Sequence, residues 1–362
     1  MIDLDNYLKQ GEPLQRERGY VWHTAIGLQR TDGLKPSDYL IATANRNINS
    51  DITLEQAQSL IDSYYKTRPA NVTETTRTEE ADKVAVRIAM MLAEKAFSFS
   101  LVEYIAIHRR LFEGVYKFAG RIRDYNISRS EWVLNGETVY YASARSIRDT
   151  LDYDFSRESE FSYKGLPMAQ TAEHIAKFTS GLWQIHAFGE GNTRTTAVFV
   201  IEYLRTFGFD VTNDIFAEYA WYFRNALVRA NYNDFKSGIH ATQEYLNRFF
   251  ANLMFGEKFV LKNRELLVRA KTEVPQSVPA CVPVNVPANV PVSVPVSVPV
   301  KITVIHQKIL SVLKENPYAT TMQMAKIIGV SDKTIKRALG TLKTAGMVER
   351  IGSDKTGHWT TK

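Results

Sequence analysis

The chain has 362 residues, of which 44% are hydrophobic and 23% charged, so its composition is that of a globular protein and excludes a disordered or fibrous one. This length allows two or three domains. The single cysteine, Cys281, excludes an intramolecular disulfide. No apolar run approaches the roughly 20 residues of a membrane-spanning helix, and the start lacks the basic and apolar parts of a signal peptide. We therefore expect a cytoplasmic protein without membrane contact.

The net charge of +6 is unevenly distributed along the chain. Residues 301–362 hold nine Lys and two Arg against four acidic residues, which gives +7, so the other 300 residues sum to −1. Any nucleic-acid contact is therefore expected at the C-terminal end.

The N-terminal part predicts helices. Residues 39–44 are apolar with helical spacing, and residues 52–57 form a capped helix start that Leu60, Ile61 and Tyr64 continue. A longer helical stretch is predicted from Glu79 to Phe112, with its apolar residues in the core. We interpret residues 1–72 as a small helical region.

Residues 131–141 indicate a β-hairpin. Asn135-Gly136 lies between two β-prone runs, which is the strongest short hairpin signal. A lone hairpin is marginally stable in water, so we expect it to pack on the helices and to keep one unpaired edge.

The chemistry concentrates in residues 186–197, HAFGEGNTRTTA. An apolar-periodic helix leads to His186, and a second periodic run follows Gly191 and Asn192, so the loop opens a helix with Asn192 near its N-cap. Unpaired amide groups and the positive end of the dipole at a helix N-terminus favour phosphate.

The side chains of this loop fit phosphoryl chemistry. Arg194 offers a fork of donors for phosphate oxygens. Glu190 is suited to Mg²⁺ on a polyphosphate, since that ion prefers one or two carboxylates plus phosphate oxygens. His186 titrates near neutrality and can accept the proton of an attacking hydroxyl. The plain alternative is a capped helix-loop-helix with a surface His and a solvated Glu–Arg pair, and the combination favours a site.

The loop resembles the signature of Fic-domain proteins, His-Pro-Phe-x-(Asp/Glu)-Gly-Asn-Gly-Arg-x-x-Arg. The resemblance extends over about residues 90–260 and includes Phe118-Ala119-Gly120-Arg121. It implies a mainly α fold, with a Fic helical bundle and a β-hairpin flap, and transfer of AMP from ATP to a protein hydroxyl. His186 would then be the base, Phe188 a buried anchor and Glu190 the Mg²⁺ ligand. The phosphate and ATP contacts implied are Gly189, Glu190, Gly191, Asn192, Thr193 and Arg194.

Three positions depart from that signature. Ala187 replaces a Pro, and Thr193 replaces a Gly where the backbone would approach phosphate. Ala197 replaces the second Arg, which in the family contacts the γ-phosphate and pairs with an inhibitory Glu. The tail of the motif also resembles the Doc toxins, which are kinases on the same scaffold. AMP transfer and phosphoryl transfer therefore both remain open.

The resemblance assigns further residues. The flap would receive an extended target segment by strand addition, through Trp132, Val133, Leu134, Val139 and Tyr140. Asn225 and Tyr232 would line a base pocket, although a helix that covers the core explains them equally well. The N-terminal region resembles part of the antitoxin modules that inhibit Fic domains through a Ser/Thr-x-x-x-Glu-Gly/Asn helix. Because this region lacks that motif, we interpret it as a docking or scaffold element.

Residues 274–299 repeat Val-Pro every four residues and hold seven of the 12 prolines, without charge or glycine. Proline fixes φ and removes a backbone donor, so an extended spacer is predicted, with a recognition ligand as the alternative.

Residues 301–362 resemble a winged helix-turn-helix domain. Two periodic helices flank a turn at Gly329-Val330-Ser331, and residues 347–350 and 357–359 indicate a hairpin wing. The outer face of the last helix offers groups suited to phosphates and base edges of DNA, namely Lys333, Thr334, Lys336, Arg337 and Thr341. A domain that docks on protein is the alternative.

We thus expect four parts, an antitoxin-like or docking region at 1–72, a Fic catalytic domain at 73–270, a linker at 271–300 and a winged helix-turn-helix at 301–362. The predicted function is protein adenylyltransferase, with Mg²⁺ as cofactor and ATP, a protein substrate and DNA as partners. Self-modification and oligomer formation are left open. The alternatives are a Doc-like kinase, or an ATP-sensing DNA-binding regulator without turnover.

Overall fold

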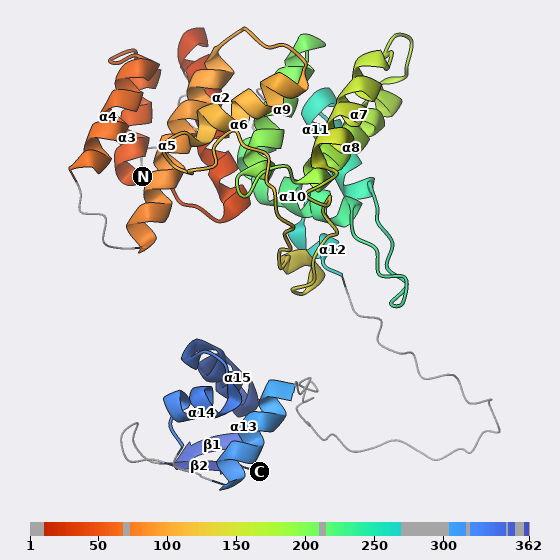
Figure 1. The fold of residues 1–362 in the computed structure, drawn as a ribbon. Coiled ribbons are helices and arrows are strands. Elements are labelled where there is room, and N and C mark those ends of the chain that lie inside the picture. The colour runs from red at the N-terminus through yellow and green to blue at the C-terminus, as the bar shows by residue number, and fades with distance from the viewer. Residues whose placement is uncertain are drawn as a thin grey trace, which may run out of the picture. The chain divides into compact units, whose positions relative to one another are not determined.

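The computed structural model describes residues 11–67, 73–209, 215–268, 304–315, 319–344, 347–351 and 358–361. The chain divides into two compact units, Met1–Pro275 and Gln276–Lys362 (Figure 1). The predicted Val-Pro linker lies outside the described residues, so its extended form and the four predicted domain boundaries stay predictions. No helix within the described ranges has the length and apolar character needed to cross a membrane.

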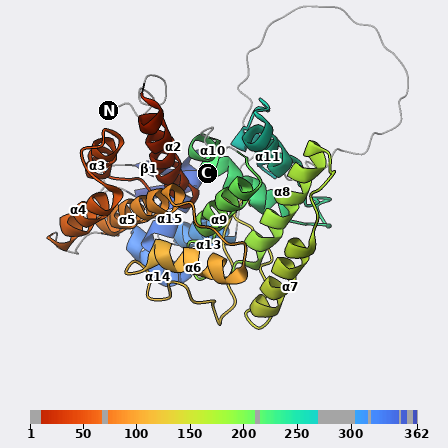
Figure 2. The ribbon, with the colours of Figure 1, turned by 90° about the horizontal axis from the view of Figure 1, so that it is seen from above.

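The first unit is built from helices, as predicted. In Figures 1 and 2 its N-terminal helices lie at one end, α7 and α8 lie at the other, and α9 runs between them. The helices of this unit are α2 Pro13–Gly27, η1 Leu28–Asp32, α3 Asp38–Ile48, α4 Leu54–Lys66, α5 Thr73–Ala93, α6 Leu101–Phe112, η2 Trp132–Leu134, α7 Ile147–Glu160, α8 Met168–Ile185, α9 Asn192–Thr206, α10 Ile215–Ala230, α11 Glu244–Phe255 and α12 Asn263–Leu266.

Helix α9 is the centre of this unit. Every residue from Asn192 to Leu204 is buried, which is the pattern of a helix enclosed on all sides. Its threonines tolerate burial because their hydroxyls find partners: Thr195 Oγ1 donates to the Gly191 carbonyl at 2.9 Å, and Thr196 Oγ1 lies 3.2 Å from the Tyr104 hydroxyl. The start of α9 is therefore held rigidly.

The N-terminal helices pack on the bundle rather than apart from it. Helix α2 lies against α5 and α10, and η1 contacts α9 and α10. Gly27 permits this approach, because a Cβ at that position would lie 2.4 Å from the Ala217 Cα of α10. The short η1 is thereby brought against the start of α9.

The stretch from 79 to 112, predicted as strongly helical, forms two helices with a break between them. Helix α5 ends at Ala93 and α6 begins at Leu101. Ser100 caps α6 by accepting the Glu103 amide at 3.1 Å, and the sequence pattern did not separate this serine from a helix interior.

The predicted hairpin at 131–141, here called the flap segment, is not confirmed. Asn135 and Gly136 adopt the expected positive φ, at 56° and 95°. However, residues 132–134 wind into η2, and the described residues between α6 and α7 contain no strand. Bonds across the turn remain, from the Glu131 amide to the Glu137 carbonyl and from the Gly136 amide to the Glu131 carbonyl, both at 2.9 Å. Burial of Val133 and Leu134 explains the coil, since both point into the core.

The second unit has the predicted winged helix-turn-helix order. It contains α13 Val304–Glu315, α14 Thr321–Ile328, α15 Asp332–Thr344, β1 Val348–Ile351 and β2 His358–Thr361. The strands are antiparallel, with Val348 opposite Thr361. Gly329 ends α14 in the left-handed region at φ 78°, and Ser331 Oγ accepts the Thr334 amide at the start of α15. A separate small core joins the helices to the wing, through Ile309, Leu313, Met324, Ile335, Leu339, Leu342 and Val348.

Candidate active site

The motif loop connects α8 to α9 through two left-handed residues. His186 follows α8 at φ 52°, and Gly191 precedes α9 at φ 76°. At Gly191 a Cβ would lie 2.4 Å from the Phe112 ring, so glycine is required there for space as well as for conformation. The predicted helix start is confirmed, with Gly191 at the N-cap and Asn192 next to it as the first helical residue.

Aromatic and amide contacts fix the loop between these ends. Phe188 is fully buried and stacks on the His108 ring with 3.7 Å between centroids, as expected of an anchor. Asn192 Oδ1 accepts the Phe188 amide at 2.9 Å, and Asn192 Nδ2 donates to the Phe188 carbonyl at 2.8 Å. Since the Asn192 side chain is committed to the loop, only its backbone amide is available to phosphate.

His108 holds the motif loop through a hydrogen bond from its ring. Its Nδ1 accepts the Gly120 amide at 2.8 Å, so Nε2 carries the proton and donates to the Glu190 carbonyl at 3.0 Å. Burial lowers the pKa of His108 to about 4, so the ring is neutral near pH 7. A neutral ring in one tautomer thus joins α6 to the motif.

His186 is a buried imidazole that faces cations. Its side chain contacts the rings of Tyr141 and Trp183, and its Nδ1 has no partner in the described part of the chain. Burial, and then the charges of Arg129, Arg224 and Arg123, lower the pKa of His186 well below its usual value. A neutral imidazole near pH 7 is the form that can accept a proton.

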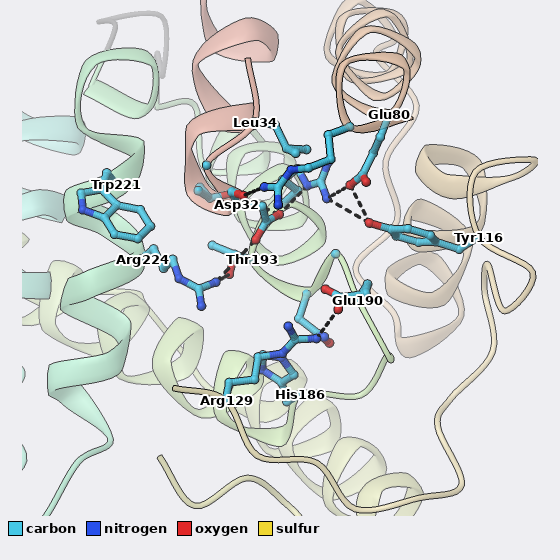
Figure 3. Close-up of a pocket in the computed structure, with 16 residues that line it drawn as sticks. Asp32, Leu34, Glu80, Tyr116, Arg129, His186, Glu190, Thr193, Trp221 and Arg224 are labelled. Carbon is cyan, nitrogen blue, oxygen red and sulfur yellow. Dashed lines mark hydrogen bonds and ion pairs between the residues drawn. The ribbon is translucent and has the colours of Figure 1, made fainter. Parts of the chain in front are cut away.

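His186 and Arg194 line one pocket of about 480 Å³. Figure 3 shows His186 and Arg129 on one side of it, Glu80 and Tyr116 on another, and Arg224 and Trp221 on a third. The charged side chains around the pocket are Arg77, Arg129, Arg194 and Arg224 with Asp32, Glu80 and Glu190. The motif's base and guanidinium are therefore brought together, as the sequence predicts.

Arg194 is already occupied by carboxylates. Its guanidinium is 1% exposed and lies 2.7 Å from Asp32 Oδ2 and 2.6 Å from Glu80 Oε1. Gln29 Oε1 accepts a further bond at 3.1 Å. Although burial opposes the charge, Asp32 and Glu80 raise the pKa of Arg194. The N-terminal region therefore reaches into the site, which its interpretation as a docking element did not anticipate.

Glu190 is the predicted metal ligand, and the structure pairs it with Arg129. Its Oε1 lies 2.7 Å from Arg129 Nη2, and its side chain is 46% exposed at the pocket. No described residue bonds its other carboxylate oxygen. No group of three or more His, Cys, Asp or Glu side chains is arranged as a metal site within the described ranges. One accessible carboxylate fits Mg²⁺ that arrives on a polyphosphate rather than a protein-built cage.

The start of α9 keeps free donors. The amides of Asn192, Thr193 and Arg194 have no acceptor within the described residues. The Thr193 side chain, which stands where the family has Gly, lines the pocket, and its Oγ1 accepts Trp183 Nε1 at 3.0 Å. This bond holds the hydroxyl against Trp183, beside the free amides.

Three other predicted residues lie apart from this pocket. The Gly189 carbonyl accepts Arg129 Nη2 at 2.7 Å. Asn225 is buried, and its Nδ2 donates to Asn263 Oδ1 at 2.7 Å. Tyr232 is also buried, and neither it nor Asn225 is among the pocket's lining residues. Their role in a base pocket stays a prediction.

The flap residues divide by exposure. Trp132 and Tyr140 are exposed, whereas Val133, Leu134 and Val139 are buried in the core. The Val133 carbonyl accepts the Val268 amide at 2.9 Å. Strand addition by a target at this segment stays a prediction.

The predicted DNA face is partly described. Lys336 and Arg337 are exposed on α15, opposite the buried Ile335 and Leu339, and Thr334 is half-buried. The side chains of Lys333 and Thr341 lie outside the described residues.

Sequence patterns missed the residues that surround the motif. Asp32, Glu80, Arg129 and Arg224 come from four different segments, and no local spacing links them to residue 194. His108 lies within the stretch predicted as helical from Glu79 to Phe112, and no pattern distinguished it there. Asp32 ends η1 and Gly33 is its left-handed C-cap, which indicates a turn but not a site.

Comparison with known proteins agrees with two of the expected domains. Residues 98–204 match the Fic/DOC family, and residues 302–349 match the winged helix-turn-helix DNA-binding family. Protein adenylyltransferase VbhT of Bartonella schoenbuchensis is 22% identical over 191 residues, which are 49% of this chain and 39% of that protein. The crystal structure of a Fic family protein from Desulfovibrio desulfuricans superposes with a TM-score of 0.40 at 14% identity, over 99% of this chain and 90% of that one. The chain therefore carries a Fic/DOC domain and a C-terminal winged helix-turn-helix domain.

Proposed function

We propose that the Fic/DOC domain transfers AMP from Mg·ATP to a Ser, Thr or Tyr hydroxyl of a protein, with the chain itself as one acceptor. The observation that carries the proposal is that His186 lies in the same pocket as the free amides at the start of α9. The similarity to an adenylyltransferase, over part of each chain, supports the same activity.

In this reaction the neutral His186 imidazole accepts the proton of the hydroxyl. The hydroxyl oxygen attacks the α-phosphorus, the bond from that phosphorus to the bridging oxygen breaks, and pyrophosphate leaves. The amides of Asn192 and Thr193 stabilise the negative charge that develops on the phosphoryl oxygens. Water is excluded around the base by Tyr141 and Trp183, which pack on its ring.

Mg²⁺ would be held by Glu190 together with phosphate oxygens, and its contribution there is neutralisation of phosphate charge. Arg129 competes for the same carboxylate at 2.7 Å. We therefore expect Arg129 to shift its contacts when the nucleotide is present.

The test is the intact mass of the purified chain after incubation with Mg·ATP. Addition of an adenylyl group supports the proposal, and addition of a phosphoryl group would instead support a Doc-like kinase. His186→Ala should abolish the modification, while His240→Ala, which removes an exposed imidazole, should retain it. A His186→Ala chain that is modified at the wild-type rate would contradict the mechanism.

We also propose that the C-terminal unit binds duplex DNA through α15. The support is the family match and the exposed Lys336 and Arg337. The affinity of the full chain for a labelled duplex is measured by fluorescence anisotropy. Lys336→Gln or Arg337→Gln should lower this affinity, and the slope of log affinity against log salt should decrease in magnitude by about one per charge removed. Lys326→Gln on α14 is the control. Equal affinity for all variants would favour a protein-docking domain.

A further inference from the structure

The family pattern places a second arginine at position 197, and this chain has none there. Ala197 is fully buried within α9, so no cation reaches the pocket from that position. A triphosphate would nevertheless need compensating charge, because Arg194 is already neutralised by Asp32 and Glu80. The pocket must therefore obtain a guanidinium from another element.

Arg224 on α10 stands at the start of α9. Its Nη1 lies 3.4 Å from Thr193 Oγ1 and 3.5 Å from Asp32 Oδ1. Both distances are longer than a good hydrogen bond of about 2.9 Å, so this end of the guanidinium has no tight partner. Figure 3 shows Arg224 directed into the pocket from the side of Trp221.

The other end of Arg224 is fixed. Its Nη2 lies 2.9 and 3.0 Å from the two oxygens of Glu131, a flap-segment residue that is itself buried. Tyr141 donates to the same carboxylate at 3.2 Å. A guanidinium held in this way is pre-organised and loses little conformational freedom on binding an anion.

Asp32 marks where that anion would lie. Its two carboxylate oxygens are shared between Arg194 Nε at 2.7 Å and Arg224 Nη1 at 3.5 Å. An anion between two guanidinium groups, beside free helix amides, is the arrangement that binds phosphate. Among the pocket's arginines in the described chain, only Arg194 and Arg224 pair with this carboxylate.

We infer that Arg224 is a phosphate-binding residue of the nucleotide site and supplies the guanidinium that position 197 lacks. The inference rests on the proposed function, because it assumes a nucleoside triphosphate in the pocket. Arg224 contacts the phosphate chain and not the base, so it contributes to the affinity for a triphosphate and not to the affinity for adenosine.

The experiment compares the affinities of the full chain for the ATP analogue AMP-PNP, with Mg²⁺, and for adenosine by calorimetry. Arg224→Gln should lower the AMP-PNP affinity about 10- to 100-fold, the effect of one charge-assisted hydrogen bond, and leave adenosine binding unchanged. Arg224→Lys should lose less, since it keeps the charge without the fork. Arg248→Gln, which breaks a partly exposed pair with Glu244, is the control for any Arg→Gln change.

A second variant separates phosphate binding from a purely structural role. Glu131→Gln breaks the Arg224–Glu131 ion pair from the other side but leaves Arg224 charged. If Arg224 only anchors the flap segment, Glu131→Gln and Arg224→Gln will lower the affinity for AMP-PNP equally, and the inference is wrong. It is also wrong if Arg224→Gln binds AMP-PNP like the wild type, or loses adenosine to the same extent.

Failure of the proposed function gives a different result. The wild type and Asp32→Asn, which removes the competing carboxylate, are measured side by side. If both are folded and neither binds AMP-PNP or adenosine, nucleotide binding is contradicted altogether. If Arg224→Gln does not fold, the comparison of Arg224→Lys with Glu131→Gln decides the question.

Discussion

The two ends of the pocket differ in what surrounds the functional side chain. At one end Arg194 is buried against Asp32 and Glu80. At the other, His186 is buried among arginines, and none of the described carboxylates bonds its ring. Against the effect of burial, Asp32 and Glu80 hold Arg194 in its charged form, whereas burial first and the neighbouring arginines second keep the His186 imidazole neutral. The Arg194 end thus binds anions, and the Asp32 and Glu80 carboxylates already occupy it. The His186 end is suited to accepting a proton.

The largest effect should follow from removing the cation at the first end. Arg194→Met keeps the volume but removes the short ion pairs of both carboxylates, so that Asp32 keeps Arg224 at 3.5 Å and Glu80 keeps the Tyr116 hydroxyl. Breaking a buried ion pair on one side costs about 3 to 5 kcal/mol. We expect a loss of that size in the free energy of unfolding, measured with urea.

Neutralising the two carboxylates as well should restore much of that stability. The triple variant Arg194→Met, Asp32→Asn, Glu80→Gln removes the uncompensated charges together. If Arg194→Met unfolds at the wild-type urea concentration, Arg194 is not the structural cation that this end of the pocket requires.

The next effect concerns His108, which supports the loop between the two ends. Its pKa is about 4 in the folded chain, against about 6.5 when unfolded. Between these values the unfolded state binds a proton that the folded state does not, so stability falls as the pH falls. From pH 7 to pH 5 the loss should be roughly 2 kcal/mol, at 1.36 kcal/mol per unit below 6.5.

Urea unfolding of the wild type and of His108→Gln at both pH values isolates this loss. The carboxylates that titrate in the same range are common to both chains, so the difference between their slopes reports His108. Parallel pH dependence in the two chains would show that the ring is not buried neutral.

A smaller effect, on nucleotide affinity, is expected from removing the charge of Asp32. Asp32→Asn keeps the shape of the side chain and removes the charge that competes with phosphate for Arg194 and Arg224. We expect AMP-PNP to bind about tenfold more tightly, which corresponds to about 1.4 kcal/mol. Asp38→Asn, on the exposed first turn of α3, is the matched control. Unchanged affinity would mean that nucleotide does not enter between these two arginines.

The comparison also separates what the sequence could and could not predict. The helices of the bundle and the helix end at His186 follow from local spacing, and the buried Phe188 follows from the resemblance of the motif to the Fic signature. The flap segment carried a true local signal at Asn135-Gly136, but burial of Val133 overrode the strand. Local propensity predicts turns better than it predicts which face is buried.

The partners of Arg194 could not be predicted from local sequence patterns, for a different reason. Arg194 meets Glu80 across 114 positions of the chain and Gln29 across 165. Such pairs leave no periodicity in the sequence, because they depend on how η1 and α5 pack on α9. The helix start at Gly191 indicated a phosphate site, whereas the carboxylates that occupy its arginine became visible only in three dimensions.

The smallest effect concerns the base end. An ordinary imidazole base makes the rate fall tenfold per pH unit below about 6.5. Because the pKa of His186 is lowered well below that value, the self-modification rate should begin to fall only at a lower pH. Burial is the main cause, and Arg129 is the next. Arg129→Gln should therefore move the acid limb of the rate profile toward pH 6.5 without abolishing the reaction. Rates of both chains between pH 5 and 8 test this, and coincident acid limbs would mean that the arginines around His186 do not keep its ring neutral.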